Sequence, residues 1–161
     1  MSLFKDLKNA TYAKHGNYLD GGTVHGSGYE YTLELVKFET GKTFAGDEHF
    51  IGTYRVIDTS SPRHKPGDEV NIYCANYGKA KANFLGNVKK QMVAIYSTMA
   101  KSPVDPAEIG ETEANLLMEP GKKAGALPGT HAEGTRVKAR TKLTLTKNKT
   151  DFTVVDLDPV W

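Results

Sequence analysis

Residues 136–147 restrict the fold most strongly, because their sequence R-V-K-A-R-T-K-L-T-L-T-K alternates cationic with small or apolar side chains. Side chains on a β-strand point to opposite faces in turn, so this pattern predicts a strand with one buried face. The other face would carry four positive charges about 7 Å apart: Arg136, Lys138, Arg140 and Lys142. A bound polyanion would relieve their repulsion, and so would acidic side chains on neighbouring strands.

The charges are segregated along the chain, although the formal net charge of the 161 residues is only +2. Residues 104–120 carry five acidic and no basic side chains, whereas residues 121–149 carry eight basic and one acidic side chain. Residues 150–161 are again acidic. The mean charge hides these blocks, which is why their distribution says more about binding partners than the total does.

The composition disfavours several classes of protein. The single cysteine, Cys74, rules out an internal disulfide and a multi-cysteine zinc site, and its apolar neighbours predict a buried residue rather than a nucleophile. No apolar run is long enough to span a membrane, and no signal peptide is recognisable, so we expect a soluble cytosolic protein. The length suits one domain with a real core.

Hydrophobic periodicity predicts four more strands, over 29–38, 49–58, 69–77 and 152–158. Residues 1–28 are broken up by glycines and predict an arm or loop. In the first strand the apolar face reverses at Val36 and Phe38. Such a reversal predicts a long strand that bends and serves two sheets, as the first strand of a small closed barrel does.

Between the third strand and the basic strand the period becomes helical. Apolar residues recur at three- and four-residue steps over 80–99, which predicts an amphipathic helix. A second helix is expected over 106–118, with Asp105 as its N-cap and Glu108 completing a capping box.

Five strands with one or two helices between the third and the fourth are the layout of an OB-fold barrel. We therefore predict a mainly β, OB-fold-like barrel over 29–158, an N-terminal arm over 1–28 and a short C-terminal tip over 159–161. An antiparallel sandwich and an open meander carrying a helix are the alternatives.

Proteins that hold single-stranded nucleic acid need a positive groove for phosphates and aromatic rings on which bases stack. Tyr73 and Tyr77 share the outer face of the third predicted strand, whereas Tyr54 and Phe50 have a weaker claim; for every ring, core packing is the alternative. The candidate binding residues are Tyr54, Arg55, Tyr73, Tyr77, Lys79, Lys81, Arg136, Lys138, Arg140 and Lys142. For Lys79 and Lys81 a solvated helix face is the alternative.

A family resemblance lies in four phrases: F-I-G-T-Y-R-V-I-D-T-S-S, K-P-G-D-E-V-N-I-Y, F-L-G-N-V-K-K-Q-M-V-A-I-Y and G-T-R-V-K-A-R-T-K-L-T-L-T-K-N-K-T-D-F-T-V-V-D. They resemble bacteriophage single-stranded DNA-binding proteins of the OB-fold type, over roughly residues 29–158. The resemblance implies a protein without enzymatic activity that coats single-stranded DNA during phage DNA replication or recombination, in the host cytoplasm.

The last residues, D-L-D-P-V-W, are similar to the acidic, aromatic-ended tips through which bacterial and some phage single-strand-binding proteins recruit partners. That similarity implies replication or recombination proteins as partners. The alternative is that Val154, Val155 and Leu157 simply complete the last strand and that Trp161 packs on the barrel. The oligomeric state is left open, a homo-oligomer included.

Catalysis is the least favoured function. The five histidines lack HxxxH or HxH spacing, and the sequence D-E-H at 47–49 would need further ligands to hold a metal. Glu30, Glu34 and Asp58 give no sign of converging on a metal. We expect no cofactor. The rival hypothesis is a phage structural or decoration protein, in which the same barrel contacts a capsid or tail subunit.

Overall fold

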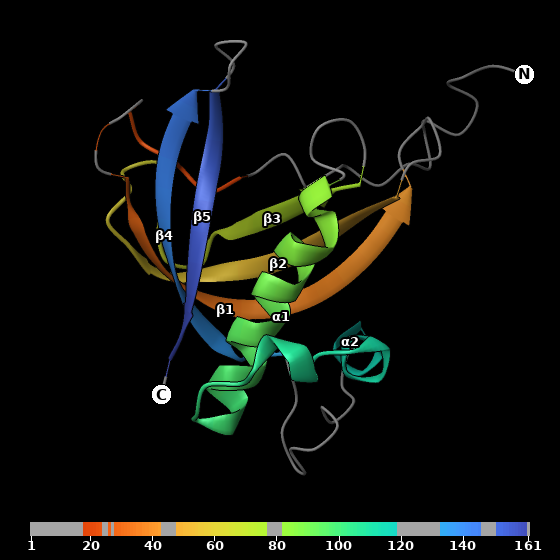
Figure 1. The fold of residues 1–161 in the computed structure, drawn as a ribbon. Helices are drawn as coiled ribbons and strands as arrows, with labels where there is room; N and C mark the ends of the chain where they lie inside the picture. Colours follow the sequence, from red (N-terminus) through yellow and green to blue (C-terminus); the bar gives the residue numbers. More distant parts are fainter. Residues whose placement is uncertain are drawn as a thin grey trace, which may run out of the picture.

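The computed structural model describes residues 18–23, 26, 28–42, 48–76, 82–118, 133–145 and 151–160. They form a five-stranded antiparallel sheet with the strand order β3-β2-β1-β4-β5 (Figure 1). The strands are β1 (Glu30–Lys42), β2 (Glu48–Thr59), β3 (Glu69–Ala75), β4 (Arg136–Leu145) and β5 (Asp151–Pro159). The helical elements are α1 (Phe84–Ala100), the 3₁₀ turn η3 (Pro106–Glu108) and α2 (Glu111–Met118).

The predicted mainly β class, with helices between the third and fourth strands, is confirmed. The sheet is open: within the described ranges β3 and β5 form its two edges and do not pair with each other. Closure into a barrel is therefore not part of the observed hydrogen-bond pattern.

β1 is a bent strand with two sets of partners. It pairs with β2 along most of its length, but with β4 only through residues 30–34. The register with β2 shifts between Leu35 and Lys37, which leaves Val36 unpaired in that ladder. Leu35 before the shift and Phe38 after it both face the core. A bulge at this point keeps apolar side chains inward on both halves, as the reversed pattern predicted.

α1 lies across one face of the curved sheet (Figure 1). Its buried side includes Met92, Ile95 and Tyr96, which join the core formed by the inward residues of the strands. The amphipathic helix predicted over 80–99 is thus confirmed. Its predicted last residue, 99, lies directly before the observed one, Ala100. The single helix predicted over 106–118 is wrong, because buried Ile109 has an extended backbone and separates η3 from α2.

A buried polar pair joins α1 to the sheet. The Tyr54 hydroxyl donates a hydrogen bond of 2.7 Å to Gln91 Oε1, and both side chains are buried. Gly52 leaves room for this contact, since a Cβ at that position would lie 2.2 Å from Gln91 Oε1. The helix is therefore fixed against β2 by a directional contact as well as by apolar packing.

Residues 18–22, here called the anchoring segment, contribute to the core. Leu19 is buried, and Tyr18 forms a parallel bridge with Asn71 of β3. The main-chain oxygen of Asp20 accepts a hydrogen bond of 2.6 Å from the Thr141 hydroxyl of β4. The segment therefore links the β3 edge to β4, and the edge of the core does not coincide with the predicted domain boundary at residue 29.

We expect Tyr54→Phe to lower the free energy of unfolding by about 1–3 kcal/mol, because it leaves the buried Gln91 Oε1 without its donor. Urea denaturation measures the change. The double variant Tyr54→Phe, Gln91→Leu removes both partners and should lose less than the sum of the single variants. Strict additivity, or an unchanged Tyr54→Phe protein, would contradict a stabilising role for this pair.

Candidate nucleic-acid interface

β4 presents its cationic side chains on the face of the sheet that is turned away from the core. Val137 and Ala139 are buried, and Thr141 is buried with them. The exposed residues of the strand are Arg136, Lys138, Arg140 and Lys142. The alternation predicted from the sequence is therefore confirmed.

Two of these four cations already have acidic partners. Arg136 Nε lies 3.4 Å from Glu34 Oε2, and Arg55 Nη1 lies 3.4 Å from the other oxygen of the same carboxylate. On the other side of β4, Arg140 Nη2 donates to Asp158 Oδ2 at 3.1 Å. The arginines and Asp158 are largely exposed and Glu34 is half-buried, so each pair contributes at most about 1 kcal/mol. They nevertheless remove the need for a polyanion to balance Arg136 and Arg140.

Lys138 and Lys142 are the cations of β4 that stay available. Neither forms an ion pair with any residue that the structure describes. Lys138 stands between Thr32 on β1 and Asp158 on β5, the carboxylate that Arg140 binds, and Lys142 stands opposite Val154 on β5. These two ammonium groups are therefore the strand's best candidates for contact with an anion.

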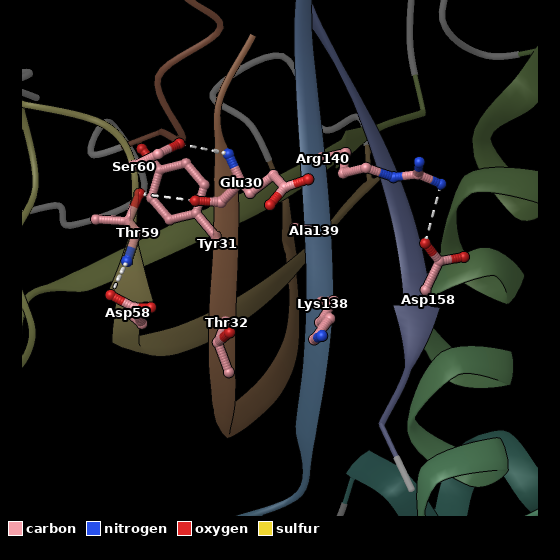
Figure 2. Close-up of a pocket in the computed structure, with 10 residues that line it drawn as sticks. All are labelled: Glu30, Tyr31, Thr32, Asp58, Thr59, Ser60, Lys138, Ala139, Arg140 and Asp158. Atoms are coloured by element: carbon pink, nitrogen blue, oxygen red, sulfur yellow. Dashed lines mark hydrogen bonds and ion pairs between the residues drawn. The ribbon is translucent and has the colours of Figure 1, made fainter.

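A polar pocket of about 540 Å³ opens on this face. It is lined by Glu30, Tyr31, Thr32, Asp58, Thr59, Ser60, Lys138, Ala139, Arg140 and Asp158. Figure 2 shows Glu30 reaching from β1 toward β4, whereas the guanidinium of Arg140 turns away toward Asp158. The main chain of Glu30 is fixed, because its N–H donates to the Ser60 hydroxyl and its oxygen accepts from the Thr59 hydroxyl.

Three carboxylates are among the residues that line this pocket, those of Glu30, Asp58 and Asp158, and nothing in the sequence pointed to this shared site. Among the described residues, however, no group of three or more His, Cys, Asp and Glu side chains is arranged to hold a metal ion. The pocket therefore offers cationic hydrogen-bond donors and anionic hydrogen-bond acceptors.

A second feature is an aromatic cluster formed by Tyr18, His49 and Tyr73. The ring centroid of Tyr73 lies 5.3 Å from that of His49 and 6.4 Å from that of Tyr18. Tyr18 is 47% exposed, and the other two rings are half-buried. Tyr73 stands opposite Ile51 on the face of β2 and β3 turned away from the core. Such a group of accessible rings can stack on planar ligands.

The sequence identified Tyr73 but missed its two neighbours. His49 lies two residues before Ile51, so the alternation of β2 placed it on the same face and was a usable signal. Tyr18 precedes the first strand in an aperiodic, glycine-rich stretch, and nothing in the sequence connected it with β3.

The basic strand β4 lies beside one half of β1, and the aromatic cluster lies level with the other half. Tyr73 is opposite Ile51, which pairs with Glu39, whereas β4 pairs with residues 30–34. At about 3.3 Å per residue, the two features are at least roughly 16 Å apart along the sheet. Only an extended ligand could touch both.

The prediction that Tyr54 stacks on bases is wrong. Its ring is fully buried and its hydroxyl is bound to Gln91, because Tyr54 shares the inward face of β2 with Phe50 and Val56. Arg55 points outward as predicted, toward Glu34. Three further candidates, Tyr77, Lys79 and Lys81, lie outside the described residues.

Two ionisable side chains, Tyr54 and Cys74, are buried on the inward face of β2 and β3. Burial raises the pKa of Tyr54 well above its usual value, and proximity to Cys74 raises it further. Burial also raises the pKa of the Cys74 thiol, against a smaller opposing effect of its hydrogen bond with Gln91. Both groups are therefore neutral near pH 7, and the prediction that Cys74 is buried is confirmed.

Comparison with known proteins adds no assignment. No protein-family model matches the chain, and no curated protein was found to match it. The described helices include none that is both long and apolar enough to cross a membrane. The function is accordingly inferred from the residues and geometry above.

Proposed function

We propose that this protein binds single-stranded DNA with little sequence preference, through an OB-fold-like domain, in phage DNA replication or recombination. The observation that carries the proposal is the aromatic cluster on the face of β2 and β3 that is turned away from the core. OB-folds hold single strands on the face formed by their second and third strands, where bases stack on aromatic side chains.

The topology supports an OB-type domain. An OB-fold is a partly open Greek-key barrel of five strands, and the order β3-β2-β1-β4-β5 is the order obtained by opening such a barrel between β3 and β5. Residues of both edge strands, β3 and β5, line one cavity of about 460 Å³ together with α1 and the two residues before it. α1 also occupies the expected place in the chain, between β3 and β4.

The charges of β4 support contact with a phosphate backbone. The ion pairs separate these cations into paired and available ones, which the sequence alone could not show. Lys138 and Lys142 are available, whereas Arg136 and Arg140 are partly neutralised by Glu34 and Asp158. We assign phosphate contact mainly to the two lysines. A strand that stacks on the aromatic cluster would then run along β1 to reach them.

The contacts of Pro159 and Val160 give no support to partner recruitment by residues 159–161, and Trp161 lies outside the described residues, so this recruitment remains a prediction. β5 extends to Pro159, and the N–H of Val160 donates to the Thr98 hydroxyl. Asp156 lies 3.3 Å from Lys90 Nζ, and Asp158 binds Arg140. The alternative, in which the last residues complete a strand, is therefore confirmed up to Pro159.

The rival proposal, a phage structural or decoration protein, is favoured by one observation. Glu34 and Asp158 compensate the basic strand from within the sheet, so the exposed charges do not by themselves require DNA. A decoration protein should ignore free DNA and be enriched in virions.

We expect the purified protein to bind a labelled thymidine oligonucleotide more tightly than a duplex of the same length. Stacking on rings needs unpaired bases, and the described helices show no groove-reading motif. Fluorescence anisotropy titrations at two salt concentrations measure both affinities. Equal or tighter binding to the duplex would refute the proposal, and binding to neither DNA would favour the decoration protein.

Changing Lys138 and Lys142 together to Gln should weaken single-strand binding and flatten its salt dependence. Each lost phosphate contact should reduce the log–log salt slope by about 0.7. Lys65→Gln with Lys101→Gln is the matched control, since it removes the same charge from exposed loops elsewhere. Arg136→Gln with Arg140→Gln should weaken binding less than the double substitution of Lys138 and Lys142 does. A slope that stays unchanged in the Lys138, Lys142 variant would remove β4 from the phosphate path.

Changing Tyr18 and Tyr73 to Ala should weaken binding by about 1–3 kcal/mol for each stacked base, with little salt dependence. The corresponding Phe variants keep the rings and should bind almost normally. Leu85→Ala, at a 75% exposed apolar residue of α1, controls for loss of exposed apolar surface. Thermal melting separates lost stacking from lost stability. Normal affinity in a well-folded Ala variant would move the binding face away from β2 and β3.

A further inference from the structure

The polar pocket contains one carboxylate that the fold does not use. Asp158 binds Arg140, and Asp58 accepts a hydrogen bond from the N–H of Thr59. The side chain of Glu30 is exposed and has no hydrogen bond or ion pair with any residue in the described part of the chain. Among the three carboxylates of the pocket, Glu30 is thus the one with neither oxygen bound to a described residue.

The neighbouring free group is the ammonium of Lys138. It lies on β4, two residues before Arg140, the residue that stands opposite Glu30. Figure 2 shows both side chains on the pocket, with the Arg140 guanidinium directed elsewhere. The pocket therefore combines an unpaired acceptor of two hydrogen bonds with an unpaired donor of three.

A free carboxylate is unsuited to a phosphate, because the two groups repel each other. It is suited to the N–H groups of a base. Guanine offers a carboxylate two adjacent donors, N1–H and the N2 amino group, and it offers an ammonium the acceptors O6 and N7. Thymine has a single N–H between two carbonyl oxygens and lacks an amino group, so it matches this pair of free groups less well.

We infer that this pocket binds a guanine base of a bound single strand, with Glu30 accepting from N1–H and N2 and with Lys138 donating to O6 or to the adjoining phosphate. The pocket's volume of about 540 Å³ can hold one nucleotide. The inference rests on the proposed function and adds one position of base preference to an otherwise unselective surface.

Three oligonucleotides of one length test this assignment: all thymidine, and thymidine with a single central guanosine or inosine. Inosine lacks only the N2 amino group. We expect the guanosine oligonucleotide to bind about tenfold more tightly than the inosine one, the scale of losing part of a bidentate contact. Glu30→Gln should abolish that difference, while affinity for all-thymidine DNA is kept or increased. This substitution leaves the main-chain hydrogen bonds of residue 30 unaffected, and a melting curve of the variant verifies that it is folded.

Glu39→Gln is the matched control, because it removes a partly exposed carboxylate from the other half of β1, where it pairs with Lys37. This variant should keep the preference for guanosine. Equal binding of the guanosine and inosine oligonucleotides would overturn the inference and leave single-strand binding intact. Failure of all three oligonucleotides to bind would overturn the proposed function as well.

Two further outcomes count against the assignment. A preference that survives Glu30→Gln but disappears in Asp58→Asn would transfer the role to Asp58. Free deoxyguanosine monophosphate that competes fully, in a Glu30-dependent manner, would make this a nucleotide pocket rather than a position on a strand. We expect the free nucleotide to compete poorly, since it lacks the contacts that the rest of the strand makes.

Discussion

The bend in β1 is the constraint on which the rest of the structure depends. One half of this strand must pair with β2 and β4 together, whereas the other half pairs with β2 alone. The bulge at Val36 allows both halves to direct apolar side chains inward although the register changes. The same bend separates two surfaces, since the polar pocket lies beside the first half and the aromatic cluster lies beside the second.

Local sequence patterns made the strands and helices predictable, but they did not predict which distant residues would contact each other. The alternation of β4 and the reversal in β1 follow from side-chain periodicity alone, and both appear in the structure. The pair of Arg136 with Glu34 joins residues 102 positions apart, so only the strand order reveals it. Tyr54 shows a different limit: its face was predictable from its neighbours, but an aromatic residue at that position fits a core as well as a binding surface. Ile109 split a predicted helix because tertiary burial outweighed a good cap.

The ion pairs change what the exposed sheet can recognise. A face with uncompensated cations would attract any polyanion over a long range, and salt would weaken the attraction sharply. Here Glu34 and Asp158 reduce that long-range attraction, so short-range contacts to bases gain weight relative to phosphate contacts. Under the proposed function, selectivity for unpaired strands would therefore depend on rings and hydrogen bonds more than on charge.

The anchoring segment also has a consequence for the order in which the chain can fold. Asp20 and Leu19 leave the ribosome before any strand, yet Asp20 bonds to Ser61 and to Thr141, which lie 41 and 121 residues later. Contacts of such separation carry a large loop-closure cost and form late. During synthesis the contacts of Leu19 and Asp20 must therefore wait for β4, so segments far apart in the sequence complete this part of the fold together.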